Sequence, residues 1–281
     1  MRKILFSLGI FALTSVCSCN HNKSSEADKP TVAEERDSMI YGLSCDGTND
    51  SVIVFLPFES GVDPIIYNVE TAKRAGKIIG QPQIGDWVGL MINPEDSTEA
   101  TMVVDLDQLK GTWTFEVRPT WKDAAHMSRR ALRRKLNEIP DSLKEAYLVP
   151  REYGFSLKRS SVASPVGYVM QHSSLEDDSP VEYPAVKHYT GWKCRNGHLI
   201  LISSPEGMAG VKNSEGDASK NKDAEPTEVY DTLDFVFMTN DSLVLLNNSG
   251  QRMAFHRKAN AMAANANAQK AAKVIEKKVM K

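Results

Sequence analysis

The sequence predicts an all-β protein with a small OB-like β-barrel followed by a larger antiparallel β-barrel that carries a short helical insertion. Within Gly111 to Val117, the residues Trp113, Phe115 and Val117 alternate with polar residues, as in a half-buried strand. Short strand-like runs separated by turn residues continue on both sides of this segment. Helical periodicity is confined to one insertion and the tail.

The beginning of the chain has the organisation of a secretory signal. The basic residues Arg2 and Lys3 precede an apolar run, Ile4 to Val16, that is too short to span a bilayer permanently. The run ends in Val-Cys-Ser-Cys, which resembles a signal peptidase II site with Cys19 as the lipid-bearing residue. Cys17 fits that site poorly, and an ordinary cleaved secretory signal is the alternative.

This interpretation sets the expected organisation and location. We expect residues 1–18 to be a lipoprotein signal peptide and residues 19–37 a flexible tether, because the latter are polar. The chain would then be anchored to a membrane through Cys19 as a cell-envelope, outer-membrane lipoprotein. Which side of that membrane it faces does not follow from the sequence.

The first barrel is expected within residues 38–107. Three strands, a short helix closed by Gly76 and two further strands give the element order of an OB-like barrel. No motif specifies that fold. The acidic turn around Asp46 lacks the spaced ligands of a calcium loop, so we expect a solvated turn. The expected elements are residues 39–44, 51–58, 65–69, 70–75, 86–93 and 98–105.

The second barrel is expected within residues 108–258, and its first and last strands carry a paired signal. Gly111 precedes Trp113 by two residues, and a larger residue there would collide with the indole. Arg257 ends the last strand on the same face as Phe255. An inward arginine is costly unless its cation finds an aromatic face or carbonyl acceptors, and Trp113 is the expected partner.

Residues 108–258 resemble the lipocalin-like domains of gram-negative envelope lipoproteins. The resemblance rests on ordered motifs: the Gly-Thr-Trp strand, Gly154-Phe155-Ser156-Leu157, Trp192 to Leu199, Asp231-Thr232-Leu233, Asp241-Ser242-Leu243 and the terminal Arg257. It implies a β-barrel that holds a small hydrophobic molecule. A related group of envelope-stress lipoproteins pairs such a barrel with an OB-like domain in the reverse order. That group has a C-x-x-C motif that this chain lacks, so copper binding and redox sensing are not implied.

The alternation of apolar residues in the expected strands predicts which side chains face the barrel interior. An eight-stranded barrel either encloses a small apolar ligand or fills its interior with side chains, and both alternatives stay open. The candidate cavity-lining residues are Phe115, Val117, Phe155, Leu157, Trp192, Leu199, Leu201, Phe235, Phe237 and Leu245.

Residues 122–149 are expected to form an insertion with two helices. Ala131, Leu132, Leu136 and Ile139 share one face of the first helix, and Asp141 is the expected N-cap of the second. The arginines of the first helix could meet anionic lipid or an acidic ligand. We favour the simpler alternative of a helix across the barrel mouth with its charges in water.

Two later segments are expected to contribute little to the barrel. Residues 203–227 are rich in Gly, Ser and charge, so a long mobile loop is predicted. Residues 259–281 are expected to be a flexible or helical tail of low order, because Val274, Ile275 and Val279 form only a thin apolar stripe.

We find no sequence pattern for catalysis or cofactor binding. The six histidines are scattered, and neither a zincin motif nor a nucleophile elbow is present. We therefore expect no enzyme activity, no cofactor and no metal. Cys45 and Cys194 lie in different expected domains, and two cysteines placed in this way are more often independent than joined by a disulfide bond. A formal charge of −2 gives no reason to expect nucleic-acid binding.

The sequence thus favours a lipid-anchored, non-enzymatic lipoprotein that binds a small hydrophobic molecule in its barrel. The alternative is a closed-barrel structural or interaction lipoprotein that engages an envelope partner or acts in envelope-stress sensing. The ligand, the protein partner and the oligomeric state do not follow from the sequence.

Overall fold

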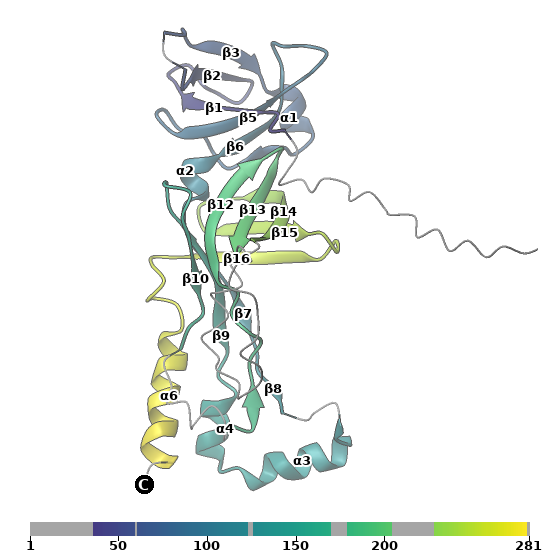
Figure 1. Cartoon of the computed structure of the whole chain (residues 1–281), viewed down its shortest axis with the longest axis vertical. Helices are drawn as coiled ribbons and strands as arrows, with labels where there is room; N and C mark the ends of the chain where they lie inside the picture. Colours follow the sequence, from purple (N-terminus) through teal and green to yellow (C-terminus); the bar gives the residue numbers. More distant parts are fainter. Residues whose placement is uncertain (1–35, 60, 123–125, 170–178, 204–227, 280–281) are drawn as a thin grey trace, which may run out of the picture. The chain divides into compact units, whose positions relative to one another are not determined.

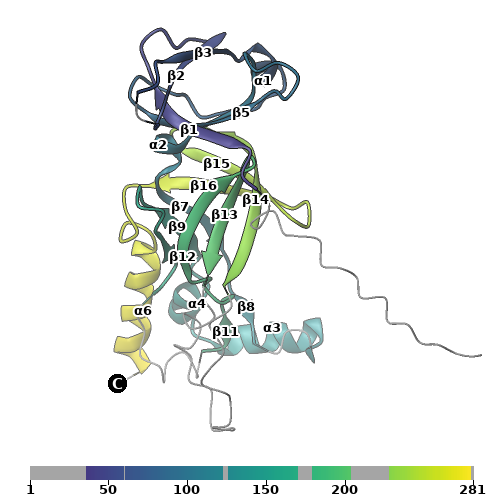
Figure 2. The same ribbon diagram turned by 45° about the horizontal axis from the view of Figure 1, so that its top comes forward.

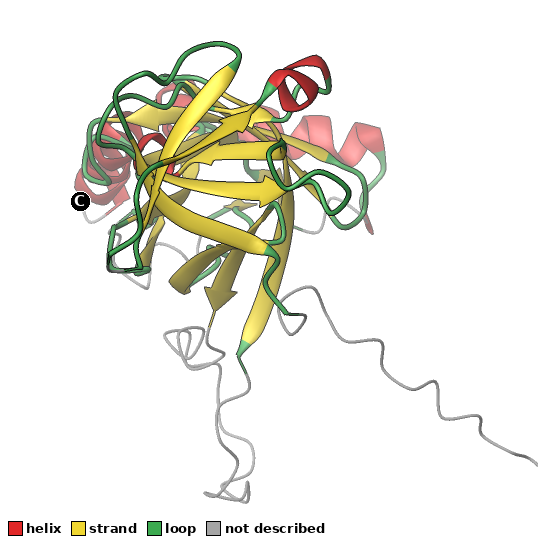
Figure 3. Cartoon of the chain, turned by 90° about the horizontal axis from the view of Figure 1, so that it is seen from above, coloured by secondary structure: helices red, strands yellow, loops and turns green. Residues whose placement is uncertain are grey.

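The computed structural model describes residues 36–59, 61–122, 126–169, 179–203 and 228–279. Strands are the predominant element of these residues (Figure 3). The predicted signal peptide, Cys19, most of the predicted tether and the loop from residue 204 to 227 lie outside them.

The N-terminal part of the described chain is a six-stranded sheet in the order β3-β2-β1-β5-β6-β4. Its pairs are antiparallel except that of β4 with β6. A parallel bridge joins Asn68, at the end of β3, to Glu99, so the sheet curls back on itself (Figure 2). Its elements are β1 (Met39–Ser44), β2 (Val52–Pro57), β3 (Ile65–Asn68), α1 (Glu70–Arg74), β4 (Ile78–Ile79), β5 (Trp87–Ile92) and β6 (Ala100–Asp105).

This sheet contains its own hydrophobic core and shares a second one. Phe55, Tyr67 and Leu90 belong to a cluster formed only by the N-terminal sheet. Met102 and Val104 of β6 belong instead to the core of the following barrel. Strand β6 is therefore buried along almost its whole length, because both of its faces are covered.

A short helix, α2 (Leu106–Leu109), connects the sheet to the barrel. The carboxylate of Asp105 caps α2 by accepting a 2.8 Å hydrogen bond from the backbone N–H of Gln108. Leu106 and Leu109 are fully buried in the barrel core. The predicted boundary between residues 107 and 108 falls inside this helix.

The next eight long strands form an antiparallel sheet in the order β10-β9-β7-β16-β15-β14-β13-β12 (Figure 1). Except between β10 and β12, which form the two edges, each strand pairs with the next barrel strand in sequence, and the last strand pairs with the first. A bridge between Val162 and Gly191 links the remaining edges, so the barrel is nearly closed. This up-and-down order is that of a lipocalin-like fold and confirms the predicted fold class. The strands are β7 (Gly111–Val117), β9 (Arg151–Leu157), β10 (Ala163–Val166), β12 (Tyr189–Arg195), β13 (His198–Ser203), β14 (Val229–Met238), β15 (Ser242–Asn247) and β16 (Arg252–Lys258).

A β-bulge in β14 changes which residues face the barrel interior. Phe235 is buried, but the register shifts between Phe235 and Phe237. One extra residue reverses the alternation, so Phe237 is 42% exposed and Met238 is buried in its place. The prediction that Phe237 lines a cavity is therefore wrong.

The insertion between β7 and β9 contains two helices, as predicted, and one strand of a two-stranded antiparallel ribbon. The ribbon pairs β8 (Thr120–Trp121) with β11 (Val181–Glu182). The helices are α3 (Arg129–Glu138), which is capped by the side chain of the preceding Ser128, and α4 (Asp141–Tyr147). The capping role predicted for Asp141 is wrong, because Pro140 occupies the N-cap and Asp141 is the first helical residue.

The C-terminal tail packs more closely than predicted. Helix α6 (Ala266–Val279) buries Ala268 and Ala272 in a small cluster with Val169. Asn265, which has a positive φ of 63°, accepts from the Glu152 N–H and donates to the Glu152 carbonyl of β9. Small alanine side chains and this double hydrogen bond hold the tail against its neighbours, and residues 266–279 form a helix, which is one of the two alternatives predicted.

Candidate ligand site in the barrel

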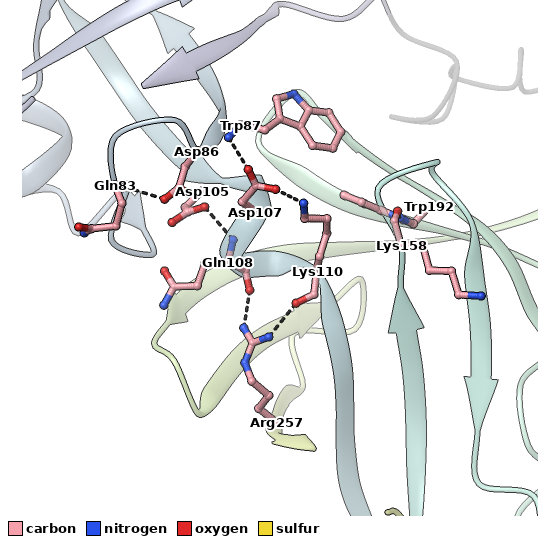
Figure 4. A network of polar contacts seen from close by, with 10 residues as sticks. All are labelled: Gln83, Asp86, Trp87, Asp105, Asp107, Gln108, Lys110, Lys158, Trp192 and Arg257. Carbon is pink, nitrogen blue, oxygen red and sulfur yellow. Dashed lines mark hydrogen bonds and ion pairs between the residues drawn. The ribbon is translucent and has the colours of Figure 1, made fainter. Parts of the chain in front are cut away.

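The closed end of the barrel is held by Arg257. Its guanidinium lies 4.1 Å from the centre of the Trp113 ring. It also donates to the backbone carbonyl of Asn240. Two further hydrogen bonds go to the backbone carbonyls of Lys110 and Gln108 (Figure 4). The Trp113 indole N–H donates a 2.7 Å hydrogen bond to the Leu109 carbonyl. An aromatic face and carbonyl acceptors, the two kinds of partner expected for an inward arginine, are thus both present. The predicted pair, Trp113 and Arg257, is in contact.

Gly111 is required at this end, for a different reason from the one predicted. Its φ is +118°, a conformation that L side chains rarely adopt. A Cβ at this position would meet Nη1 of Arg257 at 2.6 Å. Glycine therefore makes room for the guanidinium rather than for the indole.

Further polar contacts fix α2 at the closed end. Asp107 accepts a 2.7 Å hydrogen bond from the Trp87 N–H and forms an ion pair with Lys110 (Figure 4). The rings of Trp87 and Trp192 lie 6.1 Å apart. Burial raises the pKa of the Asp105 carboxyl to about 6, above its usual range.

The other end of the barrel opens into a cavity of about 990 Å³. Three of the predicted lining residues, Phe115, Val117 and Phe155, are among those that line it. Leu233 and Met253 add further apolar wall. This volume is within the range of small-molecule sites in proteins.

Aromatic rings that line the cavity pack against one another, either edge to face or tilted. The rings of Phe115 and Phe255 are 5.4 Å apart, and those of Phe155 and Phe255 are 5.1 Å apart. Phe155 also contacts Tyr189 at 6.1 Å. Phe155 and Phe255 are almost fully buried, so they separate the cavity from the packed core beyond them.

A small polar group accompanies this apolar wall. The Tyr189 hydroxyl donates a 3.0 Å hydrogen bond to Oδ2 of Asp231, and Lys187 forms a 2.6 Å ion pair with the same oxygen. Burial, and then the charge of Asp231, raise the pKa of Tyr189, so the phenol stays protonated at neutral pH. Glu116, Arg118 and Arg252 also border the cavity, so its lining is mixed. An apolar wall beside polar groups can bind and orient an apolar molecule that has one polar end.

The remaining predicted lining residues have a different role. Six of them are buried in the packed core of the barrel and do not line the cavity as the described residues define it. They are Leu157, Trp192, Leu199, Leu201, Phe235 and Leu245. The two alternatives left open by the sequence, a filled and a hollow barrel, therefore both occur in one molecule.

A second, smaller cavity of about 560 Å³ lies between β9, α4, α6 and residues 179–188. Arg151 stacks over the ring of Tyr183 at 3.7 Å. The hydroxyl of that tyrosine donates to the carbonyl of Val149 at 2.6 Å. Tyr153 lines both cavities.

The cysteines and histidines among the described residues do not line the larger cavity. Cys45 and Cys194 are free cysteines, and burial raises the pKa of the Cys194 thiol, which makes it a poor nucleophile. Within the described residues, no three His, Cys, Asp or Glu side chains are grouped so that they could hold a metal ion. His198 instead pairs with Asp234 at 2.5 Å. The described helices include none with the length and apolar character needed to cross a membrane.

Several site residues were missed because their signal is weak in the sequence. Tyr189 and Asp231 are far apart in the chain and meet only after β12, β13 and β14 pair. Met253 lies on the predicted interior face of the last strand, and that alternation could have identified it. No sequence pattern around Lys187 identifies it as a residue of this site.

No family model matches the chain, and no curated protein matches it. Among solved structures, the chain is similar to a lipocalin-like protein from Bacteroides thetaiotaomicron VPI-5482, with 20% identity over 53% of this chain and 94% of that one. The TM-score of this match is 0.26. The lipocalin-like fold is assigned from the strand order of the barrel.

Proposed function

We propose that this protein is a non-enzymatic binding protein that holds a small hydrophobic molecule in the open end of its barrel. The observation that carries the proposal is the 990 Å³ cavity with its wall of aromatic and aliphatic side chains. Removing apolar ligand surface from water supplies the binding free energy, at about 25 cal/mol per Å². The Tyr189–Asp231–Lys187 group would position a polar end of the ligand.

We also propose that the chain is a lipid-anchored outer-membrane lipoprotein with Cys19 as the modified residue. This part rests on the sequence pattern around Val16 and Cys19. Metabolic palmitate labelling of the full chain tests it. Cys19→Ala should lose the label and move the protein to the soluble fraction. If Cys17→Ala loses the label and Cys19→Ala keeps it, the lipid is attached to Cys17 and this part of the proposal is wrong.

The N-terminal sheet is proposed to be an OB-like barrel that serves as a support. Its strand order, β3-β2-β1-β5-β6, with α1 after β3 and a parallel bridge between residues 68 and 99, supports that assignment. Its contacts with the barrel include the end of β12, where the Tyr41 hydroxyl donates to the Cys194 carbonyl at 2.6 Å, and the side-chain packing of β6 on the barrel core. The cavity lies elsewhere, along β7, β9, β14 and β16.

The binding proposal is tested with a neutral apolar dye, N-phenyl-1-naphthylamine, and the full chain carrying Cys19→Ser to prevent acylation. Met253→Arg places a charge on the half-buried cavity wall, from which the long side chain can reach water. We expect dye affinity to fall at least tenfold, because the charge must be desolvated when the dye binds.

The matched control is Met262→Arg, which makes the same change at a residue that is 86% exposed. Its dye affinity should stay within about twofold of the parent, and uptake should depend little on salt. Equal losses for the two variants would contradict the cavity site. Failure of the parent to take up any dye would favour the alternative of a scaffold that engages an envelope partner or takes part in envelope-stress sensing.

A further inference from the structure

The helices at the open end of the barrel carry an excess of positive charge. Helices α3, α4 and α6 together contain ten Lys and Arg residues but only four Asp and Glu residues. Their net charge is therefore +6, in a chain whose formal charge is −2. Figures 1 and 2 place α3 and α4 beyond the end of β7, with α6 beside β9 and α4.

The basic side chains of α3 are exposed and have no ion-pair partner among the described residues. Arg129, Arg130, Arg133, Arg134 and Lys135 are all exposed. Among the residues that the structure describes, none of these five forms an ion pair. Helix α6 adds four more exposed lysines: Lys270, Lys273, Lys277 and Lys278.

Helix α3 also has an apolar stripe that the protein covers incompletely. Ala131, Leu132, Leu136 and Ile139 recur at helical spacing and are only half-buried. No described residue of α3 is fully buried. A helix that packs on a core normally buries such a stripe, whereas a helix that lies in a membrane interface has apolar residues beside a basic face.

We infer that the basic helices α3 and α6, here called the cationic helices, dock on a membrane surface with anionic phospholipid headgroups. Anionic headgroups complement the charge, and the interface below them accepts Leu132, Leu136 and Ile139. An acidic nucleic acid would not need the apolar stripe. Neither helix carries an aromatic side chain on which bases could stack.

Vesicle sedimentation tests this inference with the full chain carrying Cys19→Ser. Phosphatidylcholine vesicles with phosphatidylglycerol are compared with pure phosphatidylcholine. Replacing Arg129, Arg130, Arg133 and Arg134 by Gln should lower affinity for the anionic vesicles at least tenfold, since each basic residue near the surface adds to binding. Replacing the four lysines of α6 by Gln is a second, independent variant with an expected loss of the same sign.

The matched control removes four exposed cations from elsewhere: Arg74, Lys77, Arg159 and Lys193 to Gln. Its affinity should fall less than twofold. Equal losses in the control and in the two helix variants would overturn the inference, because net charge alone would then explain binding. Binding that is equally strong on neutral vesicles, or that is found only with an acidic protein or nucleic acid, would also overturn it.

The dye assay separates this inference from the binding proposal. The α3 variant should keep its affinity for N-phenyl-1-naphthylamine, because none of its changed residues lines the cavity among the described residues. Loss of vesicle binding with dye binding intact is the expected pattern.

Discussion

The two ends of the barrel are built from the same strands but differ in how their interior is used. At the closed end, Trp113, Arg257 and α2 fill the space, and backbone carbonyls accept from the guanidinium. At the open end, the same strand β7 ends in Phe115 and Val117, which line a cavity. A strand can therefore contribute to a rigid core in its first half and to a binding site in its second.

This difference implies an unequal sensitivity to mutation. Trp113 is fully buried, so Trp113→Ala should lower the free energy of unfolding by about 3–5 kcal/mol. Phe115 already borders a cavity and is half-buried, so Phe115→Ala should cost about 1–2 kcal/mol. Urea unfolding of both variants measures the two values. A larger loss for Phe115→Ala would contradict the division into a packed and a hollow end.

The closed end should also make stability depend on pH through Asp105. The pKa of its carboxyl is raised from 3.8 to about 6 by burial, so the folded state binds this proton more tightly than the unfolded state does. Its stabilising contribution is full below pH 3.8 and is lost as the pH rises through about 6. The size of this contribution is at most about 3 kcal/mol.

Asp105→Asn keeps an oxygen for the Gln108 N–H and removes the titration. The difference in free energy of unfolding between the parent and Asp105→Asn should therefore change between about pH 4 and pH 7, with the parent losing stability relative to the variant. Urea titrations across that range measure it. A constant difference would show that Asp105 does not titrate there.

Alanine substitutions at two glycines separate the cost of backbone strain from the cost of a clash with Arg257. Gly111→Ala and Gly250→Ala both place a side chain at positive φ, but only the first brings a Cβ against Arg257. Gly111→Ala should cost about 1–3 kcal/mol, and Gly250→Ala about 1 kcal/mol. Equal thermal shifts for the two variants would mean that Arg257 can move aside.

The contact between Trp113 and Arg257 should appear as an energetic coupling. Single changes to Ala and the double change form a cycle, and we expect a coupling of about 0.5–3 kcal/mol because both members lose the same contact. Strictly additive losses would show that the pair contributes nothing beyond separate packing.

The closed end could be predicted more fully than the open end, for physical reasons. The alternation of apolar residues in β7 and β16 is local, and a buried arginine needs acceptors, so the contact between Trp113 and Arg257 followed from the sequence. The bulge that exposes Phe237 depends on pairing between β14 and β15, which no local pattern marks. Whether Leu201 lines a cavity or fills the core depends on the volumes of all its neighbours.

The same contrast applies outside the barrel. The longer strands of the N-terminal sheet were predicted within a residue or two, but the two-residue strands β4 and β8 have too few residues to show a period. The tail packs through Ala268 and Ala272, which contribute little to a hydrophobic pattern, and through Asn265. Its order depends on contacts with β9 that sequence periodicity does not contain.

The most direct test of the account uses methionine methyl groups as reporters of the two ends. Met253 lines the cavity, whereas Met238 and Met102 are buried in the packed core. Carbon-13 methyl spectra of the full chain carrying Cys19→Ser are recorded during titration with N-phenyl-1-naphthylamine. The Met253 signal should shift with the dye, while the signals of Met238 and Met102 stay in place. Shifts at Met238 and Met102 with none at Met253 would contradict it.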